Sequence, residues 1–360
     1  HKRGGAVSQT FGSNATFRTF ARLDSGDLNE SGTRFSVSYA RLNGDLWKGQ
    51  GYDHSDNVNA KLVQPLARES SLKVFFDWSS TQQFDYQDMT KNWLSTAGSN
   101  LSNYYPDYTA AYQAAQGTYP AQVSKTNDPK DAAYYAGTAN RVDYLGGITL
   151  DENLTSNLNW KTTLYGHADT GYSTWTTPYK ASPNGAPLSQ RVQQPQVARG
   201  GFESAVTWKV ARHTLNAGVW YEYGNFETGR YFSQAPLLGQ GTLGNPTNGF
   251  PGDKIFATAW HEAFSSNTFV FHMQDTYRVT DTLKINAGFK SMIVNAGNSV
   301  LAQDQAINGK PIAQGHLEAS NAFLPQISAN WRFLPHHELF FDVSHNMRSF
   351  PEDGFATNIS

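Results

Sequence analysis

Aromatic side chains gather in one stretch of this sequence, residues 84–138, at a density that could form a binding surface for a ring-shaped ligand. Aromatic faces pack on planar organic groups, and phenol hydroxyls add hydrogen bonds. The side chains that we predict to contact a ligand are Tyr86, Trp93, Tyr104, Tyr105 and Tyr108 in this stretch, and Trp175, Tyr231 and Trp260 on other predicted loops. The alternative is that these rings pack the loop on itself, with a short helix over 110–116. A negatively charged ligand would also favour Arg or Lys nearby.

Two motifs resemble catalytic or cofactor sites but lack the context that such sites need. Residues 239–244 match G-x-G-x-x-G, but they lie in a Gly/Pro-rich stretch rather than between a strand and a helix. His261-Glu262 is not followed by a second His at the spacing of a zinc protease. The chain has no Cys, which excludes thiolate metal sites. We therefore predict no catalytic residues, no cofactor and no metal site.

The elements that must position these side chains are β-strands. Apolar and polar residues alternate with period 2 along the whole chain, as in 215–223, where Leu215, Val219 and Tyr221 oppose Asn216 and Glu222. Alternation and turn signals predict about thirteen strands. Many of them run for about 9–13 residues, longer than the soluble average of about 5–6 and long enough for a tilted strand to cross a bilayer.

The composition favours a membrane protein built from strands. Charged residues make up 16% of the chain and aromatic residues 14%, yet the mean hydropathy is −0.54. A barrel strand shows only one face to lipid, so its mean hydropathy stays low while its aromatic content rises. No run of about 18 uncharged apolar residues is present for a membrane helix. The net charge of −2 gives no indication of nucleic-acid binding.

The predicted connections alternate in length from residue 24 onward. Short polar turns lie near 67–71, 151–156, 210–213, 280–282 and 334–337, and long loops lie near 44–57, 80–138, 172–198, 224–266 and 297–320. An outer-membrane barrel has short turns at its periplasmic rim and long loops outside. A soluble sandwich or propeller has no reason to place every long loop at one end. The sequence therefore predicts an all-β, antiparallel transmembrane barrel with short periplasmic turns and long extracellular loops.

Several phrases resemble TonB-dependent outer-membrane receptors, in the order in which that family has them. Residues 272–290, HMQDTYRVTDTLKINAGFK, are similar to the family's Q-D-T-Y-x-x-T-D-x-L-x-x-N-x-G-x-R hairpin. The phrases in 323–333 and 338–348, with the strand end Ser-His-Asn-Met-Arg, resemble the next hairpin. Near the start, 4–7 with 11–13 resembles the passage from the plug domain into the first barrel hairpin.

The resemblance implies that residues 1–360 are a partial receptor barrel. The plug domain and the C-terminal strands are expected to be missing, because about thirteen strands is an odd number, because the chain begins without a signal peptide, and because 355–360 follow a turn without a closing strand. The implied function is energy-coupled uptake of a scarce large solute, foremost a ferric siderophore, through the outer membrane of a Gram-negative bacterium. The implied partners are that solute, outer-membrane lipid, and TonB through the missing plug.

Three alternatives stay open at this point. Related receptors take cobalamin, haem or oligosaccharide, and the phrases above do not separate them. A passive porin-like channel is distinguished by the absence of an upstream plug of roughly a hundred or more residues. A soluble all-β carbohydrate-binding or hydrolytic protein would need a pair of carboxylates for hydrolysis, and no pair stands out.

Overall fold

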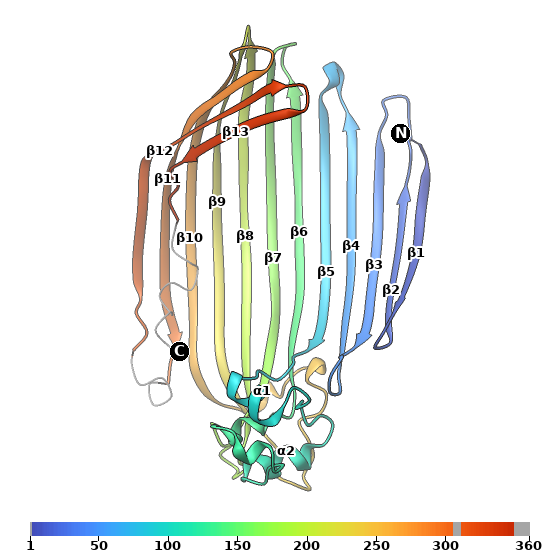
Figure 1. The fold of residues 1–360 in the computed structure, drawn as a ribbon, viewed down its shortest axis with the longest axis vertical. Helices are drawn as coiled ribbons and strands as arrows, with labels where there is room; N and C mark the ends of the chain where they lie inside the picture. Colours follow the sequence, from blue (N-terminus) through green and yellow to red (C-terminus); the bar gives the residue numbers. More distant parts are fainter. Residues whose placement is uncertain (1, 305–310, 349–360) are drawn as a thin grey trace.

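The described residues form one antiparallel sheet of thirteen strands in sequence order, which confirms the prediction of about thirteen strands. The computed structural model describes residues 2–304 and 311–348, so the predicted chain end at 355–360 lies outside it. The strands are β1 (Gly4–Gly12), β2 (Thr16–Asp24), β3 (Arg34–Asp45), β4 (Tyr52–Pro65), β5 (Ser71–Phe84), β6 (Gly137–Asn153), β7 (Leu158–Thr177), β8 (Ser189–Val210), β9 (His213–Gln234), β10 (Ile255–Arg278), β11 (Leu283–Ala302), β12 (Gly315–Leu334) and β13 (His337–Ser344). Figure 1 shows β1 to β10 side by side, and the sheet order places β1 and β13 at the two edges.

Two short α-helices lie in the connection between β5 and β6 and gather at one end of the sheet (Figure 1). Helix α1 (Lys91–Ala97) begins after Thr90, whose hydroxyl accepts a hydrogen bond from the Trp93 amide at 3.2 Å. Helix α2 (Tyr108–Ala115) begins after Asp107, whose carboxylate accepts from the Ala110 amide at 2.9 Å. Such caps satisfy amide groups that the first turn leaves unpaired. The helix predicted over 110–116 is confirmed with slightly earlier bounds.

Five single-turn 3₁₀ segments complete the described elements. They span η1 (Ala67–Glu69), η2 (Val123–Lys125), η3 (Pro129–Ala132), η4 (Pro246–Asn248) and η5 (Gly252–Lys254). Within residues 2–304 and 311–348, no helix is both long enough and apolar enough to span a membrane.

The alternation gives the sheet an apolar face and a polar face. On β10, the apolar face carries Phe269, Met273 and Tyr277, which are 41%, 44% and 37% exposed. His272 and Gln274 lie between them and point to the polar face, because successive side chains of a strand point to opposite sides. Exposed apolar side chains of this kind continue on β7, β8 and β11. A face of this composition is suited to lipid rather than to water.

The strands of the second half run well beyond the lengths predicted for them. Strand β10 has 24 residues and would extend over roughly 80 Å, whereas a bilayer core is about 30 Å thick. The predicted loops 172–198 and 224–266 are therefore wrong in extent, since β7 continues to Thr177, β8 begins at Ser189, β9 continues to Gln234 and β10 begins at Ile255. The alternation of apolar and polar residues ends before these strands do, because a strand portion beyond the bilayer thickness needs no lipid-facing side.

The predicted alternation of loop length holds from β4 onward but fails earlier. The end that carries the helices has the long connections 85–136, 178–188, 235–254 and 303–314, and the opposite end has the short turns 66–70, 154–157, 211–212, 279–282 and 335–336. The connection 46–51 at the helical end is shorter than 25–33 at the opposite end, so the long loop predicted at 44–57 is wrong. Here β3 and β4 extend into the predicted loop and pair from Asp45–Tyr52 onward.

Candidate functional site

The connection 85–136 and the strand ends around it form a compact aromatic unit, which we call the cap. Its main cluster contains Phe84, Tyr108, Tyr112 and Tyr135, which are between 2% and 6% exposed. The Tyr108 hydroxyl donates to the Pro236 carbonyl at 2.7 Å, which ties α2 to the connection between β9 and β10. Burial raises the pKa of Tyr135 to about 12, because the ionised phenolate would lose its hydration there. The cap is therefore a packed core outside the strand wall.

The predicted residue Trp93 lies inside the cap. Its side chain is 1% exposed and packs with Val123 and Ala132 in a second cluster. Its indole Nε1 is buried without a hydrogen-bond partner among the described residues. For Trp93 the arrangement is the one named as the alternative, in which the ring packs the loop on itself.

Three of the other four predicted cap residues are only partly buried. Tyr86 and Tyr104 are partly exposed and pack against the main cluster. The Tyr86 hydroxyl accepts from the Trp47 amide at 3.0 Å, and the two rings lie 5.8 Å apart. Tyr105 lies between Phe84 and Tyr135, with ring centroids 5.0 and 5.5 Å away. Tyr86, Tyr104 and Tyr105 therefore remain within reach of a ligand at the cap surface, whereas Tyr108 is 3% exposed.

Trp175, Tyr231 and Trp260 lie on strands β7, β9 and β10, so their predicted placement on loops is wrong. Trp175 stacks on Tyr134 of the cap, with ring centroids 4.2 Å apart. Trp260 is 8% exposed and carries the Arg230 guanidinium 4.0 Å above its ring. These strands continue past the bilayer thickness, and their outer ends bring wall residues and cap residues into contact.

A chain of polar contacts crosses the polar face of strands β6, β7 and β8 below the cap. Asp143 Oδ2 lies 2.6 Å from His167 Nε2, and Arg199 Nε donates to His167 Nδ1 at 3.1 Å. Because Nδ1 accepts from Arg199, the imidazole proton must sit on Nε2, where it faces Asp143. The register makes these contacts, since it pairs Leu145 with His167 and His167 with Arg199.

The contacts continue onto β9 through an aromatic side chain. Arg199 Nη1 lies 3.9 Å from Glu222 Oε1, and the Tyr165 hydroxyl donates to Glu222 Oε2 at 2.6 Å. Trp220 Nε1 donates to the same hydroxyl at 2.8 Å. Gly201 makes room for this phenol, because a Cβ there would lie 2.8 Å from the Tyr165 hydroxyl oxygen. The result is a paired polar strip across four strands, here called the wall strip.

A groove of about 300 Å³ lies beside the wall strip on β8 to β11. Its lining combines charged groups, Arg199 and Glu222, with the apolar side chains Phe226, Phe264 and Met292. A pocket with apolar walls and a few placed polar groups is typical of small-molecule sites. This groove can hold a solute that passes along the polar face, but it brings together no nucleophile and base of the kind that covalent catalysis needs.

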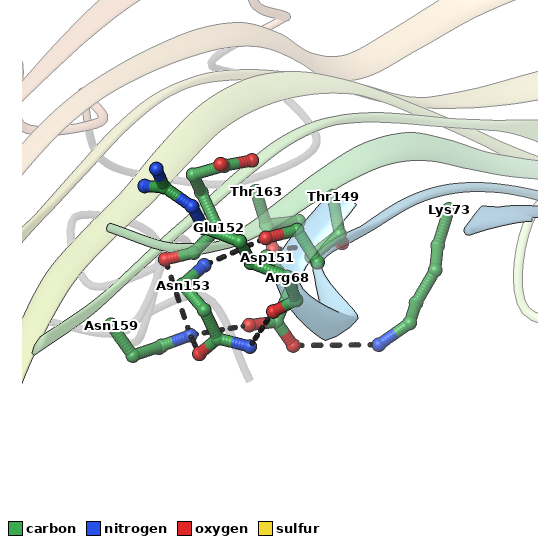
Figure 2. A network of polar contacts seen from close by, with 9 residues as sticks. Arg68, Lys73, Thr149, Asp151, Glu152, Asn153, Asn159 and Thr163 are labelled. Carbon is green, nitrogen blue, oxygen red and sulfur yellow. Dashed lines mark hydrogen bonds and ion pairs between the residues drawn. The ribbon is translucent and has the colours of Figure 1, made fainter. Parts of the chain in front are cut away.

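A second polar network lies on the same face at the short-turn end (Figure 2). Asn159 Nδ2 donates to Asp151 at 2.8 Å and to Asn153 at 3.0 Å, and Lys73 reaches Asp151 at 3.5 Å. Asn153 Nδ2 also donates to the Arg68 carbonyl at 3.0 Å, which joins the turn 66–70 to β6. These contacts brace the rim where β5, β6 and β7 meet.

The remaining motifs of the sequence carry no chemistry in this arrangement. Residues 239–244 lie in the connection 235–254 and are followed by the single-turn η4 (Pro246–Asn248) rather than by an α-helix, as their Gly/Pro context predicts. Within 2–304 and 311–348, no group of three or more His, Cys, Asp or Glu side chains is placed to hold a metal ion. His261 lies 2.6 Å from Glu227, so it forms an ion pair or hydrogen bond with that side chain.

Comparison with solved structures places this fold among outer-membrane transport receptors. The chain matches the ferripyoverdine receptor of the outer membrane of Pseudomonas aeruginosa (TM-score 0.63, 13% identity), the ferric-catecholate import receptor Fiu of E. coli K12 (0.62, 10%) and the ferric yersiniabactin uptake receptor FyuA of Yersinia pestis (0.61, 12%). The matches cover 96%, 95% and 95% of this chain, and 42%, 50% and 46% of those chains. No protein-family model and no curated protein sequence matches the chain.

These solved structures are TonB-dependent siderophore receptors, which are transport proteins rather than enzymes. This chain has the fold of their barrel portion and spans about half of their length or less. The resemblance drawn from the sequence phrases is thereby confirmed at the level of the fold. Identities of 10–13% carry no more than that.

Proposed function

We propose that this chain is the barrel part of an outer-membrane receptor that takes up a ferric siderophore by energy-coupled transport. The observation that carries the proposal is the combination of a receptor-barrel fold with an aromatic cap at one end and a paired polar strip on one face. In a closed barrel the polar face would line the lumen and the apolar face would contact lipid. Tyr86, Tyr104 and Tyr105 are proposed to contact the solute.

The proposal includes a location and partners. The cap would face the cell exterior and the short turns the periplasm, in the outer membrane of a Gram-negative bacterium. A plug domain and further strands would belong to the same protein, as the coverage of 42% to 50% of the matched receptors suggests. TonB would act through that plug. Energy-coupled uptake of this kind serves a solute that is too large or too scarce to enter passively.

The cap also bears on the passive-channel alternative. Its clusters are packed at the end of strands β5 to β10, and the Tyr52 hydroxyl lies 2.6 Å from the Thr247 hydroxyl in the 235–254 connection. This contact joins segments that lie far apart in the sequence and holds the outer connections together. A wide pore would instead need an unobstructed mouth over a water-filled lumen. The cap therefore supports a receptor that binds before it transports.

The test is uptake by cells that express the full-length receptor gene. Cells would be supplied with radioactive iron as a ferric tris-catecholate, ferric citrate or a neutral ferric trihydroxamate, with and without a protonophore that collapses the energy supply. We expect receptor-dependent accumulation of at least one complex that stops when the protonophore is added. Accumulation that persists without energy would identify a passive channel, and no receptor-dependent accumulation of any complex would contradict the proposal. Expression should also rise under iron limitation.

A further inference from the structure

Two arginine side chains lie together on the polar face at the outer ends of β8 and β9. Arg191 is paired with Phe232 in the register, and Arg230 is paired with Gln193, so the two arginines are diagonal neighbours on one face. Both are half-buried. Like charges at this spacing on one face repel each other.

Neither guanidinium has a carboxylate partner within the described residues. Arg191 makes no hydrogen bond or ion pair there, although the negative charge of Asp88 acts on it at longer range. Among the described residues, Arg230 donates one hydrogen bond, from Nη2 to Gln193 Oε1 at 3.0 Å, and its buried Nε finds no partner. A half-buried guanidinium is ordinarily paired, because desolvation of the charge is costly.

Each arginine lies on a tryptophan ring. Arg230 is 4.0 Å from the centroid of Trp260 and Arg191 is 6.0 Å from that of Trp175. Cation–π contacts hold the charges in place, but they occupy only one face of each guanidinium, so in-plane N–H groups other than the Arg230 Nη2 group bound to Gln193 can still donate hydrogen bonds. The buried Thr228 hydroxyl, two residues before Arg230 on the same face of β9, also has no hydrogen-bond partner in the part of the chain that the structure describes. Several hydrogen-bond donors thus lie close together at one place, beside the buried Glu262 that the register pairs with Thr228.

The position of the pair fits a point of solute entry. Tyr134 of the cap stacks on Trp175, and on the other side Trp260 packs with Phe232 and Ile312. Along β9, the same face leads from Arg230 through Thr228 and Phe226 to Glu222, which line or adjoin the groove beside the wall strip. A solute held at the arginine pair would therefore lie between the cap and the groove.

We propose that Arg191 and Arg230 form a binding site for an anionic group with two adjacent oxygens, a carboxylate or a catecholate, and that the site selects negatively charged ferric complexes over neutral ones. Guanidinium forks pair with such groups through two parallel hydrogen bonds. The anion would supply the direct hydrogen-bonded partner that neither guanidinium finds in a carboxylate of the described residues, and the Trp rings would pack on a catechol ring. This specificity rests on the proposed function, but anion binding itself does not.

The experiment compares full-length receptor with the variants Arg191→Gln and Arg230→Gln, each purified in detergent. Binding of iron-free citrate and of iron-free 2,3-dihydroxybenzoate is followed by Trp fluorescence, and binding of ferric citrate, ferric tris-catecholate and a neutral ferric trihydroxamate by retained radioactive iron. Arg278→Gln, at the exposed short-turn end of β10, is the matched control. Arg191→Gln removes no hydrogen bond among the described residues, so we expect this variant to fold and its change in binding to report on the site.

We expect each site variant to bind at least one anionic probe roughly 10- to 100-fold more weakly than the unaltered receptor, as is typical for a charged hydrogen bond. Affinity for any neutral complex that binds, and all affinities of Arg278→Gln, should stay the same. Equal anion binding in the site variants, no anion binding by the unaltered receptor, or an equal loss for the neutral complex would overturn the site. Arginine-dependent anion binding without energy-coupled uptake would instead retain the site and overturn the proposed function.

Discussion

Aromatic side chains are buried in the cap but exposed on the apolar face of the strand wall. In the cap, Trp93 and Tyr135 are 1% and 2% exposed and pack against other side chains. In the wall, Tyr144 and Trp160 are 43% and 38% exposed on the apolar face. Residue type alone therefore does not show whether an aromatic ring is a core residue, a lipid anchor or a ligand contact. The surroundings decide, and the two regions should respond differently to the same kind of substitution.

The largest effect is expected inside the cap. Trp93→Ala removes a fully buried ring and should destabilise the local fold of 85–136 by about 3–5 kcal/mol, while the strands stay folded. Hydrogen exchange of the cap and its cleavage by external protease would both report the change. Leu94→Ala, at a neighbour that is 46% exposed, is the control and should change cap stability by less than about 0.5 kcal/mol. Equal protection of both variants would show that the cap has no core.

In the strand wall, a charged substitution should destabilise the barrel most on the apolar face. Leu164→Arg places a charge on the exposed apolar side of β7, where Leu164 is 55% exposed, and should cost about 2–4 kcal/mol in a bilayer. Thr163→Arg adds the same charge one residue away on the polar face and should cost far less. Urea unfolding in lipid vesicles, read by the electrophoretic mobility of the folded barrel, measures both. A similar cost at the two positions would mean that the faces are assigned wrongly.

A smaller effect is expected in the wall strip. Gly201→Ala brings a Cβ to 2.4 Å from the Tyr221 carbonyl oxygen and 2.8 Å from the Tyr165 hydroxyl, so the phenol must move away from Glu222. Overpacking of this kind costs about 1–3 kcal/mol. Gly200→Ala is the matched control, since its Cβ would come no closer than 3.5 Å to a neighbouring atom. If both substitutions proved equally mild, Tyr165 would not depend on the space at Gly201.

Substitution of Tyr135 should change cap stability least at neutral pH, and its effect should become clear only at alkaline pH. Burial raises its pKa in the fold to about 12, above the usual value near 10. The neutral phenol therefore stabilises the fold fully below about pH 10, and this contribution is lost as the pH rises through about 12. Tyr135→Phe should flatten the alkaline fall in cap stability, followed by hydrogen exchange between pH 9 and 12. An unchanged fall would assign the titration to other tyrosines.

The sequence predicted the elements whose pattern is local. Period-2 alternation predicted thirteen strands, and the run of tyrosines in 84–138 marked the connection that forms the cap. The outer strand extensions were missed because their residues, such as Trp175 and Trp260, contact the cap or other strand ends instead of alternating between lipid and lumen. The predicted loops therefore began where the alternation of apolar and polar residues stopped, although the strands continue further.

The polar sites could not be predicted because they depend on register. Asp143, His167, Arg199 and Glu222 are separated by more than twenty residues at each step and become neighbours only through the pairing of β6 to β9. The arginine pair is a similar case, since Arg191 and Arg230 meet across β8 and β9. The sequence did show charged residues at polar-face positions of long strands. Which of these residues contact each other could be known only from the strand register.

The central claim, that the cap lies outside the cell and the short turns lie in the periplasm, is tested most directly by labelling of single cysteines. The chain has no Cys, so Ser124→Cys in the cap and Ser156→Cys in the turn 154–157 would each be the only thiol in this part of the receptor. We expect a membrane-impermeant maleimide to label Ser124→Cys in intact cells, and Ser156→Cys only after the outer membrane is permeabilised. Labelling of Ser156→Cys but not Ser124→Cys in intact cells, or of both alike, would contradict the account.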